Sequence, residues 1–281
     1  MNFEEFARGH GLIIDHIEPF RWVATPTVDH PRKKNGRYKF MGDHGFVQNW
    51  ATMPKVAIWK PERRIELSPG FKVARAKHDA ERQKNADRAA VKAQQIIDQC
   101  LNAPHPYLER KGFPDEASRV WVIDDPNEPA PKRLLVVPMW CDGHLVGAQL
   151  IDEQGEKKFL YGQISKGATF DMRAKGVTIL CEGYATGLSI RTVMNAIKLP
   201  YTIRVCFSAA NVKEVARSVE GGIVVADNDP NGVGEKAARD TGKPYWISPA
   251  VGEDFNDYHR RVGVFQAALS LKKILLQSKT P

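Results

Sequence analysis

The feature that most constrains this chain is an alternation of apolar runs with helical stretches after residue 176. These runs are strand-sized and mainly apolar, and they lie at 177–181, 203–207, 222–226 and 244–247. Stretches suited to helices separate them, at 185–197, 212–219 and 234–241. This alternation is typical of a parallel sheet covered by helices on both faces. The sequence therefore predicts an α/β domain in the C-terminal part of the chain.

Three further parts are predicted upstream. Aromatic residues and turn formers predict a small β-rich domain, with strands at 37–40 and 45–50. A polar run from 73 to 102 without Gly or Pro predicts a long helix. Strand patterns then follow at 119–123, 134–140, 145–152 and 157–161. The predicted division is 1–70 (small β-rich domain), 71–103 (helical spacer), 104–174 (mainly β lobe) and 175–281 (α/β domain with a C-terminal helix).

The charge is unevenly distributed along the chain. The 281 residues include 41 Lys+Arg and 33 Asp+Glu, a net charge of +8. Residues 1–103 contain 18 Lys+Arg and 12 Asp+Glu, so the N-terminal part accounts for +6 of that excess. A basic excess of this kind indicates a polyanionic partner.

The sequence has no recognisable signal peptide and no recognisable membrane-spanning segment. The N-terminal residues lack a basic stretch followed by an apolar run, and the longest apolar runs are far below the roughly 20 residues that span a bilayer. The four cysteines are widely spaced and form no CxxC pair. We expect a cytoplasmic protein with reduced thiols, no bound zinc and no membrane partner.

Acidic residues follow three of the predicted strands. Glu182 follows the first, Asp227 and Asp229 follow the third, and Asp254 and Asp257 lie after the fourth. Carboxyl ends of parallel strands meet at one edge of a sheet, and carboxylate oxygens suit Mg²⁺, with Mn²⁺ as an alternative. An Asp after a strand is also a common helix cap or turn residue. The three groups together favour a metal and phosphate site.

These residues carry a family resemblance. The segments CEGYATGLS at 181–189, VVADND at 224–229 and GEDFND at 252–257 resemble, in order and spacing, the Toprim domain of bacteriophage and plasmid DNA primases. Upstream, HPYLERKG at 105–112, VVPM at 136–139, LVGAQ at 145–149 and KKFLYG at 157–162 resemble the lobe that precedes Toprim in such primases.

The resemblance implies a fold and an activity. The fold would be a Rossmann-like parallel sheet with helices on both faces, preceded by the β-rich lobe. The activity would be synthesis of short RNA primers on a single-stranded DNA template from NTPs, in the cytoplasm of a bacterial host and with a separate replicative helicase as partner. Asp227 and Asp229 would bind Mg²⁺, Asp254 and Asp257 would complete or support the site, and Glu182 would be a further ligand or a general base.

Basic residues of the lobe would face template and nucleotides in such an enzyme. The candidates by position are Lys157, Lys158, Lys166, Arg110 and Lys111. Solvated surface residues are the alternative for each of them.

The first 70 residues depart from the family pattern. Primases of this type usually begin with a zinc ribbon, and its cysteine ligands are absent here. We expect a metal-free relic that uses aromatic packing in place of zinc. The basic candidates Arg32, Lys33, Lys34 and Arg37 lie beside Trp22 and Tyr38, a combination that suits contact with a single strand, although aromatic residues of this region also suit a small core.

Two other functions compete with a primase. A Toprim nuclease or topoisomerase-type enzyme would share the acidic residues, but a topoisomerase also needs a large domain with a nucleophilic Tyr. A nucleic-acid-binding replication module with weak or lost catalysis is the other alternative, since neither zinc ligands nor a GxxxxGK[ST] motor motif is present.

Overall fold

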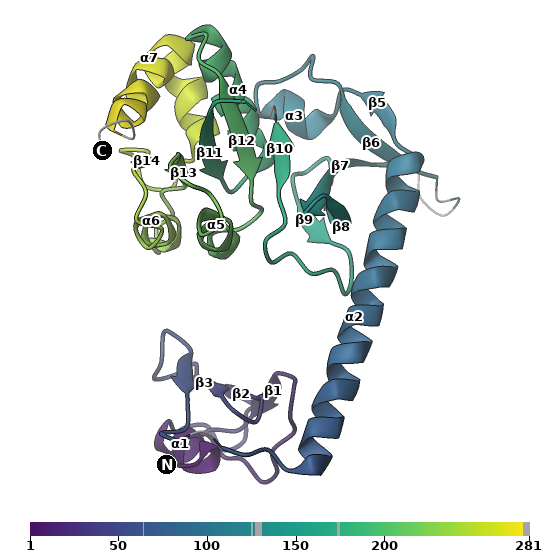
Figure 1. The fold of residues 1–281 in the computed structure, drawn as a ribbon, viewed down its shortest axis with the longest axis vertical. Helices are drawn as coiled ribbons and strands as arrows, with labels where there is room; N and C mark the ends of the chain where they lie inside the picture. The colour runs from purple at the N-terminus through teal and green to yellow at the C-terminus, as the bar shows by residue number, and fades with distance from the viewer. Residues whose placement is uncertain (64, 125, 127–130, 173–174, 278–281) are drawn as a thin grey trace. The chain divides into compact units, whose positions relative to one another are not determined.

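The structure is a computed structural model that describes residues 1–63, 65–124, 126, 131–172 and 175–277 (Figure 1). The chain divides into two compact units, Met1–Gln83 and Lys84–Pro281. This division falls within the predicted spacer. The predicted boundary at 174 lies outside the described residues, and the four-part division stays a prediction.

The first unit is built on a four-stranded antiparallel sheet. It contains α1 (Phe3–Gly9), β1 (Val23–Thr25), β2 (Gly36–Phe40), β3 (Gly45–Asn49) and β4 (Ala57–Trp59), with strand order β1-β2-β3-β4. Side chains from α1, from the segment that follows it and from one face of the sheet form the core, namely Phe3, Ala7, Leu12, Tyr38, Val47 and Trp59. The predicted strands at 37–40 and 45–50 are confirmed as β2 and β3, and the core of the unit is aromatic and aliphatic.

The long polar helix α2 (Pro69–Asp98) is also confirmed, but it ends earlier than the sequence predicts. Its buried residues lie in its second half and are Ala86, Ala89, Ala93 and Ile96. The stretch predicted as the last helical turn is instead the strand β5 (Leu101–Ala103), which pairs with the next strand along the chain. Sheet pairing outweighs helix propensity at this point.

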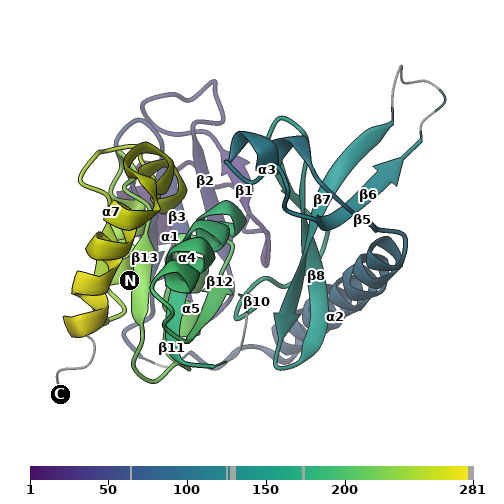
Figure 2. The same ribbon diagram turned by 90° about the horizontal axis from the view of Figure 1, so that it is seen from above.

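A second antiparallel sheet forms the lobe of the second unit. Its elements are β5, α3 (Pro106–Arg110), β6 (Ser118–Ile123), β7 (Lys132–Cys141), β8 (His144–Ile151) and β9 (Lys157–Phe159), with strand order β5-β6-β7-β8-β9. The second half of α2 packs on one face, where Ala93 and Ile96 meet Val136 (Figure 2). Alternate residues of β7, Leu135 and Val137, face the other way into the main core.

The third sheet carries the predicted α/β pattern. Its elements are β10 (Phe170–Met172), β11 (Val177–Cys181), α4 (Tyr184–Ala196), β12 (Tyr201–Val205), α5 (Ala209–Ala216), β13 (Ile223–Ala226), α6 (Val233–Arg239), β14 (Tyr245–Ile247) and α7 (Phe255–Gln277). The strand order is β10-β12-β11-β13-β14. Strands β11 to β14 are parallel, as predicted, and the short edge strand β10 runs antiparallel to β12.

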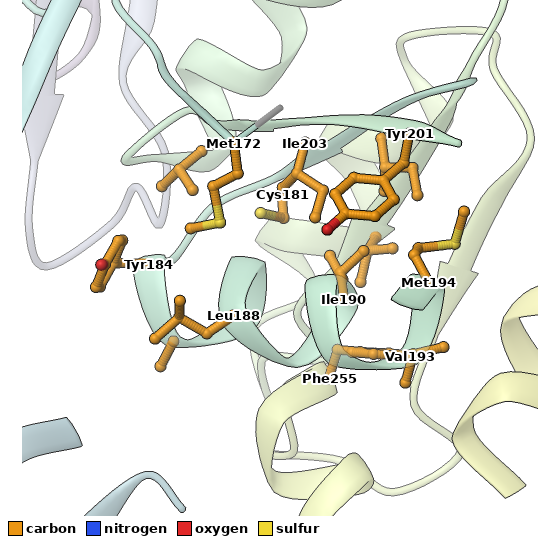
Figure 3. Close-up of a cluster of buried hydrophobic side chains, with 14 of the residues drawn as sticks. Met172, Cys181, Tyr184, Leu188, Ile190, Val193, Met194, Tyr201, Ile203 and Phe255 are labelled. Carbon is orange, nitrogen blue, oxygen red and sulfur yellow. The ribbon is translucent and has the colours of Figure 1, made fainter. Parts of the chain in front are cut away.

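Helices cover both faces of this sheet, as Figure 1 shows. Helices α4 and α7 pack on one face, where Leu188, Ile190 and Phe255 meet the strands in the main core (Figure 3). Helices α5 and α6 pack on the other face in a smaller cluster. Because the main core also contains Leu108 and Leu135 of the lobe, lobe and α/β sheet fold around one shared interior.

Helix α7 is interrupted at Gly263, whose φ of 79° is not helical. The two pieces are residues 255–262 and 264–277, and the second corresponds to the predicted C-terminal helix. Its buried residues Ala267, Leu271 and Leu275 close the main core. Among the residues that the structure describes, no helix combines the length and the apolar content that crossing a membrane requires.

Candidate active site

Two of the predicted acidic residues follow neighbouring strands of the sheet. Glu182 comes directly after β11 and Asp227 directly after β13. These strands pair in parallel, with Cys181 opposite Val225, so both carboxylates emerge at the same edge. Asp229 follows in the turn after β13 and acts electrostatically on both. The fold therefore brings the first two predicted acidic groups together.

The surroundings of Asp227 disfavour the charged form of its carboxyl. Burial, together with the charges of Asp254, Glu182 and Asp229, raises the pKa of its carboxyl to about 7. Its Oδ1 atom is buried and has no hydrogen-bond partner. A buried carboxylate oxygen without a partner is costly, and a cation or a proton would relieve that cost.

The backbone around Asp227 depends on a glycine. A Cβ at Gly234, near the start of α6, would lie 2.3 Å from the carbonyl oxygen of Asp227. Real Cβ atoms do not approach a backbone oxygen so closely, so this close approach of helix and strand end requires glycine. Gly234 thus helps to set the position of the residue that carries the raised pKa.

Glu182 is also buried near another carboxylate, but a lysine and a backbone hydrogen bond partly offset the rise in its pKa. Burial and the charge of Asp229 raise the pKa of its carboxyl. Opposing these effects are the charge of Lys157 and a hydrogen bond with the backbone of Ala209, the first residue of α5. The result is a half-buried carboxylate that is held by a helix N-terminus and faces other carboxylates.

The third acidic group is already engaged within the structure. Asp254 caps α7, since its Oδ1 atom accepts a hydrogen bond from the backbone N–H of Asp257 at 2.8 Å. The Nζ atom of Lys111, at the end of α3, lies 3.8 Å from Asp254 Oδ2 and 3.3 Å from Asp257 Oδ1. Asp254 still raises the pKa of Asp227. Lys111, a residue of the lobe, therefore neutralises part of the negative charge of Asp254 and Asp257.

A second lobe residue approaches the other two acidic groups. Lys157, on β9, has its Nζ atom 3.9 Å from the position that a Cβ on Gly183 would take. Its charge opposes the rise in pKa at both Glu182 and Asp227. Phe159, two residues along the same strand, meets Phe207 edge to face at 6.5 Å between ring centroids. Strand β9 therefore borders the acidic edge.

The donor set fits a hard divalent cation in its chemistry. All the candidate donors are carboxylate oxygens, the preferred ligands of Mg²⁺, and one of them is buried without a partner. Among the described residues, no three acidic, His or Cys side chains stand close enough together to form a ready-made metal site.

The segment that carries these acidic residues matches a known protein family. Residues 177–264 match the Toprim domain family. This segment is similar to a Toprim domain, and the match covers less than a third of the chain. The match covers all three acidic groups and confirms the resemblance of this segment to Toprim domains.

Two solved structures are also similar to the chain. One is a structure of bacteriophage T7 lagging-strand DNA polymerase interacting with primase domains of two gp4 subunits bound to an RNA/DNA hybrid and dTTP. The matched chain of that structure is 15% identical to this one. The match covers 60% of this chain and 84% of that chain, with a TM-score of 0.40. The other is the primase fragment of the bacteriophage T7 primase-helicase protein, 16% identical, with 62% and 69% covered and a TM-score of 0.36. Both TM-scores lie below 0.5. No match was found among curated proteins.

Three predicted basic residues lie elsewhere in the second unit. Lys158 pairs with Glu156 at 3.3 Å, and Lys166 pairs with Glu214 at 3.2 Å. Arg110 donates a hydrogen bond to the backbone carbonyl of Glu153. These contacts do not bring them to the Toprim carboxylates, and their role in binding nucleic acid stays a prediction.

The predicted basic residues of the first unit are accessible to solvent. Arg32, Lys33 and Lys34 are exposed, and Arg37 is partly exposed. Tyr38, which the sequence analysis set beside them as a stacking residue, is buried at 1% exposure in the core. Tyr38 is therefore a core residue, the alternative that the sequence left open for the aromatic residues of this region, because neighbouring residues of β2 point to opposite faces of the sheet.

Sequence reasoning missed the polar network that joins the Toprim helices. Asn256 is fully buried, and its Nδ2 atom donates to Ser189 Oγ and to the carbonyl of Lys111, both at 2.9 Å. His259 Nδ1 lies 3.1 Å from the same serine oxygen. The sequence feature that could have indicated this network is Asn256, the one amide side chain in the GEDFND motif at 252–257.

Proposed function

We propose that this protein is a DNA primase that synthesises short RNA primers on single-stranded DNA by metal-dependent nucleotidyl transfer. The observation that carries the proposal is the Toprim edge itself, where Asp227 has an unpartnered, buried carboxylate oxygen beside Glu182 and near Lys157. Such an edge favours a cation and, through it, a phosphate group. The lobe that shares the Toprim core supports a polymerising enzyme over an isolated Toprim module.

In the proposed reaction, the 3′-hydroxyl oxygen of one nucleotide forms a bond with the α-phosphorus of an incoming NTP. The bond from that phosphorus to the bridging oxygen breaks, and pyrophosphate leaves. The hydroxyl proton must go to a base. When bound, Mg²⁺ neutralises charge on the phosphates and helps to align the reacting groups.

We assign Glu182 as the general base that accepts the proton of the 3′-hydroxyl. Burial raises the pKa of its carboxyl, which makes the carboxylate a better proton acceptor, and a hydrogen bond with the backbone of Ala209 holds it in place. Asp227 and Asp229 are assigned to the cation, with Asp254 in support. Asp257 is assigned to holding Asp254 and Lys111 rather than to the ion itself, since its backbone N–H and its carboxylate already engage them.

Two lysines of the lobe are assigned to the substrate phosphates or to positioning the carboxylates. Lys157 lies beside the Glu182–Gly183 turn and suits a nucleotide phosphate. Lys111 holds Asp254 and Asp257. Single-stranded DNA, NTPs and a separate replicative helicase are the partners that this proposal implies.

The test is primer synthesis in vitro. The full chain is incubated with single-stranded DNA, labelled NTPs and Mg²⁺ or Mn²⁺, and the products are separated by length. Short oligonucleotides that require the metal and disappear in Glu182→Gln and Asp227→Asn would support the proposal. Asp240→Asn is a matched carboxylate-to-amide control, because Asp240 pairs with Lys213 and Lys236 on the outer helices.

Other outcomes distinguish the competing functions. Metal-dependent shortening or nicking of the DNA, lost in the same two variants, would identify a Toprim nuclease. DNA binding without any product, unchanged in both variants, would identify a binding module.

A further inference from the structure

Asn211 is a buried amide side chain on α5 to which the proposed function assigns no role. Only 6% of the residue is exposed, and its amide group hydrogen-bonds with three backbone groups outside α5. A buried amide is costly unless its donor and acceptor atoms are satisfied, and here both have partners. The partners of Asn211 therefore show which segments of the chain it holds together.

One of these segments is the turn between β12 and α5, residues 206–208. Asn211 Nδ2 donates a hydrogen bond to the carbonyl oxygen of Cys206 at 2.8 Å. The backbone N–H of Asn211 donates to the carbonyl oxygen of Ser208 at 3.0 Å and to Ser208 Oγ at 3.2 Å. Both ends of the turn are thus bonded to the same residue.

The same turn holds the backbone of Glu182. The middle residue of the turn, Phe207, has a φ of 68°, in the left-handed region that residues with a side chain rarely adopt. In this conformation the N–H of Phe207 donates to the carbonyl oxygen of Glu182 at 2.9 Å. A disfavoured backbone conformation persists where its surroundings enforce it. The hydrogen bonds of Asn211 on either side of Phe207 do so here.

The other segment held by Asn211 lies in the connection from β9 to β10. Asn211 Oδ1 accepts a hydrogen bond from the N–H of Gly167 at 2.7 Å, and Nδ2 donates to the carbonyl oxygen of Ala168 at 2.8 Å. The next residue, Thr169, exchanges two backbone hydrogen bonds with Trp140 of β7, at 2.8 and 2.9 Å. The segment is therefore fixed to the lobe on one side and to α5 on the other.

This connection begins at β9, the strand that borders the acidic edge. Lys157 of β9 acts electrostatically on Glu182, and Phe159 of β9 meets the ring of Phe207. The turn at Phe207 is thus joined to the lobe twice, by ring contact with β9 and by the amide of Asn211 through the segment that follows β9. Both contacts set the position of the turn relative to the strand that carries Lys157.

We propose that Asn211 is a positioning residue for Glu182, because it fixes the turn that holds Glu182 at a set place relative to the lobe. The inference rests on the proposed function, in which Glu182 accepts the proton of the 3′-hydroxyl. A general base must lie within hydrogen-bond reach of that proton, so a small shift of the turn lowers the rate of the chemical step. Asn211 acts through the backbone of Cys206 and Ser208.

The first experiment measures primer synthesis by the full chain carrying Asn211→Asp or Asn211→Ala, over a range of NTP concentrations. Asn211→Asp keeps the shape of the side chain but sets a carboxylate against two carbonyl oxygens, whereas Asn211→Ala removes both donated bonds without adding charge. We expect kcat to fall by about 10- to 100-fold in either variant. The KM for NTP should change little, because Lys157 stays on β9.

Val215→Ala is the matched control. Val215 is a buried residue of the same helix and packs in the smaller cluster on that face of the sheet. Its truncation leaves a cavity, so it lowers stability without removing a hydrogen bond of Asn211. We expect kcat to be unchanged in this variant well below its midpoint of thermal unfolding, which circular dichroism measures for every variant.

A second experiment requires no enzymatic activity. Amide hydrogen exchange of the full chain in EDTA is followed by NMR at the N–H of Phe207 and at the N–H of Val224, which donates to the carbonyl of Pro244 at 3.0 Å. Release of the turn should raise the exchange rate at Phe207 relative to that at Val224 by about 10-fold in both Asn211 variants. Val215→Ala should leave this ratio unchanged.

Four results would overturn the inference. Three concern activity: folded Asn211 variants with an unchanged kcat, a change confined to the KM for NTP, or an equal loss of kcat in Val215→Ala. The fourth is an unchanged ratio of exchange rates in the Asn211 variants, whatever their activity. If the unchanged chain synthesises no primers, the proposed function fails, and the exchange ratio alone then decides whether Asn211 holds the turn at Glu182.

Discussion

Asp227 concentrates the electrostatic cost of the site in one side chain. Its pKa of about 7, against 3.8 for an ordinary Asp, means that the folded state holds the proton to a higher pH than the unfolded state. The stability that Asp227 contributes is therefore present at low pH and is lost as the pH rises from about 4 to about 7.

Replacing Asp227 by Asn removes this loss. We expect Asp227→Asn to become more stable relative to the unchanged chain as the pH rises from 5 to 8, by about 1–3 kcal/mol in the free energy of unfolding. Urea denaturation in EDTA at the two pH values measures the difference. A gap that is the same at both pH values would show that Asp227 does not titrate in this range.

Lys111 compensates two carboxylates of the same site at once. We expect Lys111→Met to lower the free energy of unfolding by only about 1 kcal/mol, because the ion pairs are partly exposed to solvent. The same change should tighten Mg²⁺ binding several-fold, since the acidic edge loses a competing cation. Calorimetric titration with Mg²⁺ measures the affinity. Lys236→Met, at an exposed ion pair of α6, is the control, and an equal gain there would refute a local effect.

At the scale of elements, Asn256 joins the two helices on one face of the Toprim sheet and the lobe. We expect Asn256→Ala to destabilise the chain by about 2–4 kcal/mol, because Ser189 loses a buried partner and the Lys111 carbonyl loses its donor. Ser218→Ala, which removes a hydroxyl bonded within its own helix end, is the matched control and should cost much less. Equal losses in the two variants, measured by thermal unfolding, would contradict this role.

The elements that sequence predicted well are those with a strong local pattern. Strands β11 and β13 are short, mainly apolar runs, and most of α2, from residue 71 on, lacks Gly and Pro, so local composition suffices to find them. The edge position of Glu182 and Asp227 then follows from parallel pairing.

The elements that sequence missed depend on tertiary partners. Strand β10 has three residues and exists through its pairing with β12. The three-residue strand β5 takes residues that local propensity assigns to a helix, because β6 offers hydrogen-bond partners. The ion pairs of Lys111 join residues that are more than 140 positions apart, and no local pattern encodes such a contact.

At the scale of the whole molecule, the second unit is expected to fold independently of the first. Residues 84–281 contain the lobe, the Toprim domain and the main core. We expect this fragment to unfold in one cooperative transition, and a fragment of residues 177–264 to fail to fold, because it lacks Leu135, Leu271 and Leu275. Circular dichroism during heating measures both. Two separate transitions in the longer fragment would contradict a shared core.

The shared core also bears on how such a chain can change during evolution. The Toprim match ends at residue 264, yet the interior that supports it includes Leu108 upstream and Leu271 downstream, and Lys111 binds carboxylates at its edge. A recombination event that exchanged only the matched segment would bring in a new set of acidic residues without their lysine and a new sheet without its closing helix. Exchange of this module between lineages is therefore expected to carry the lobe and the C-terminal helix along with it, so that all three are inherited as a block.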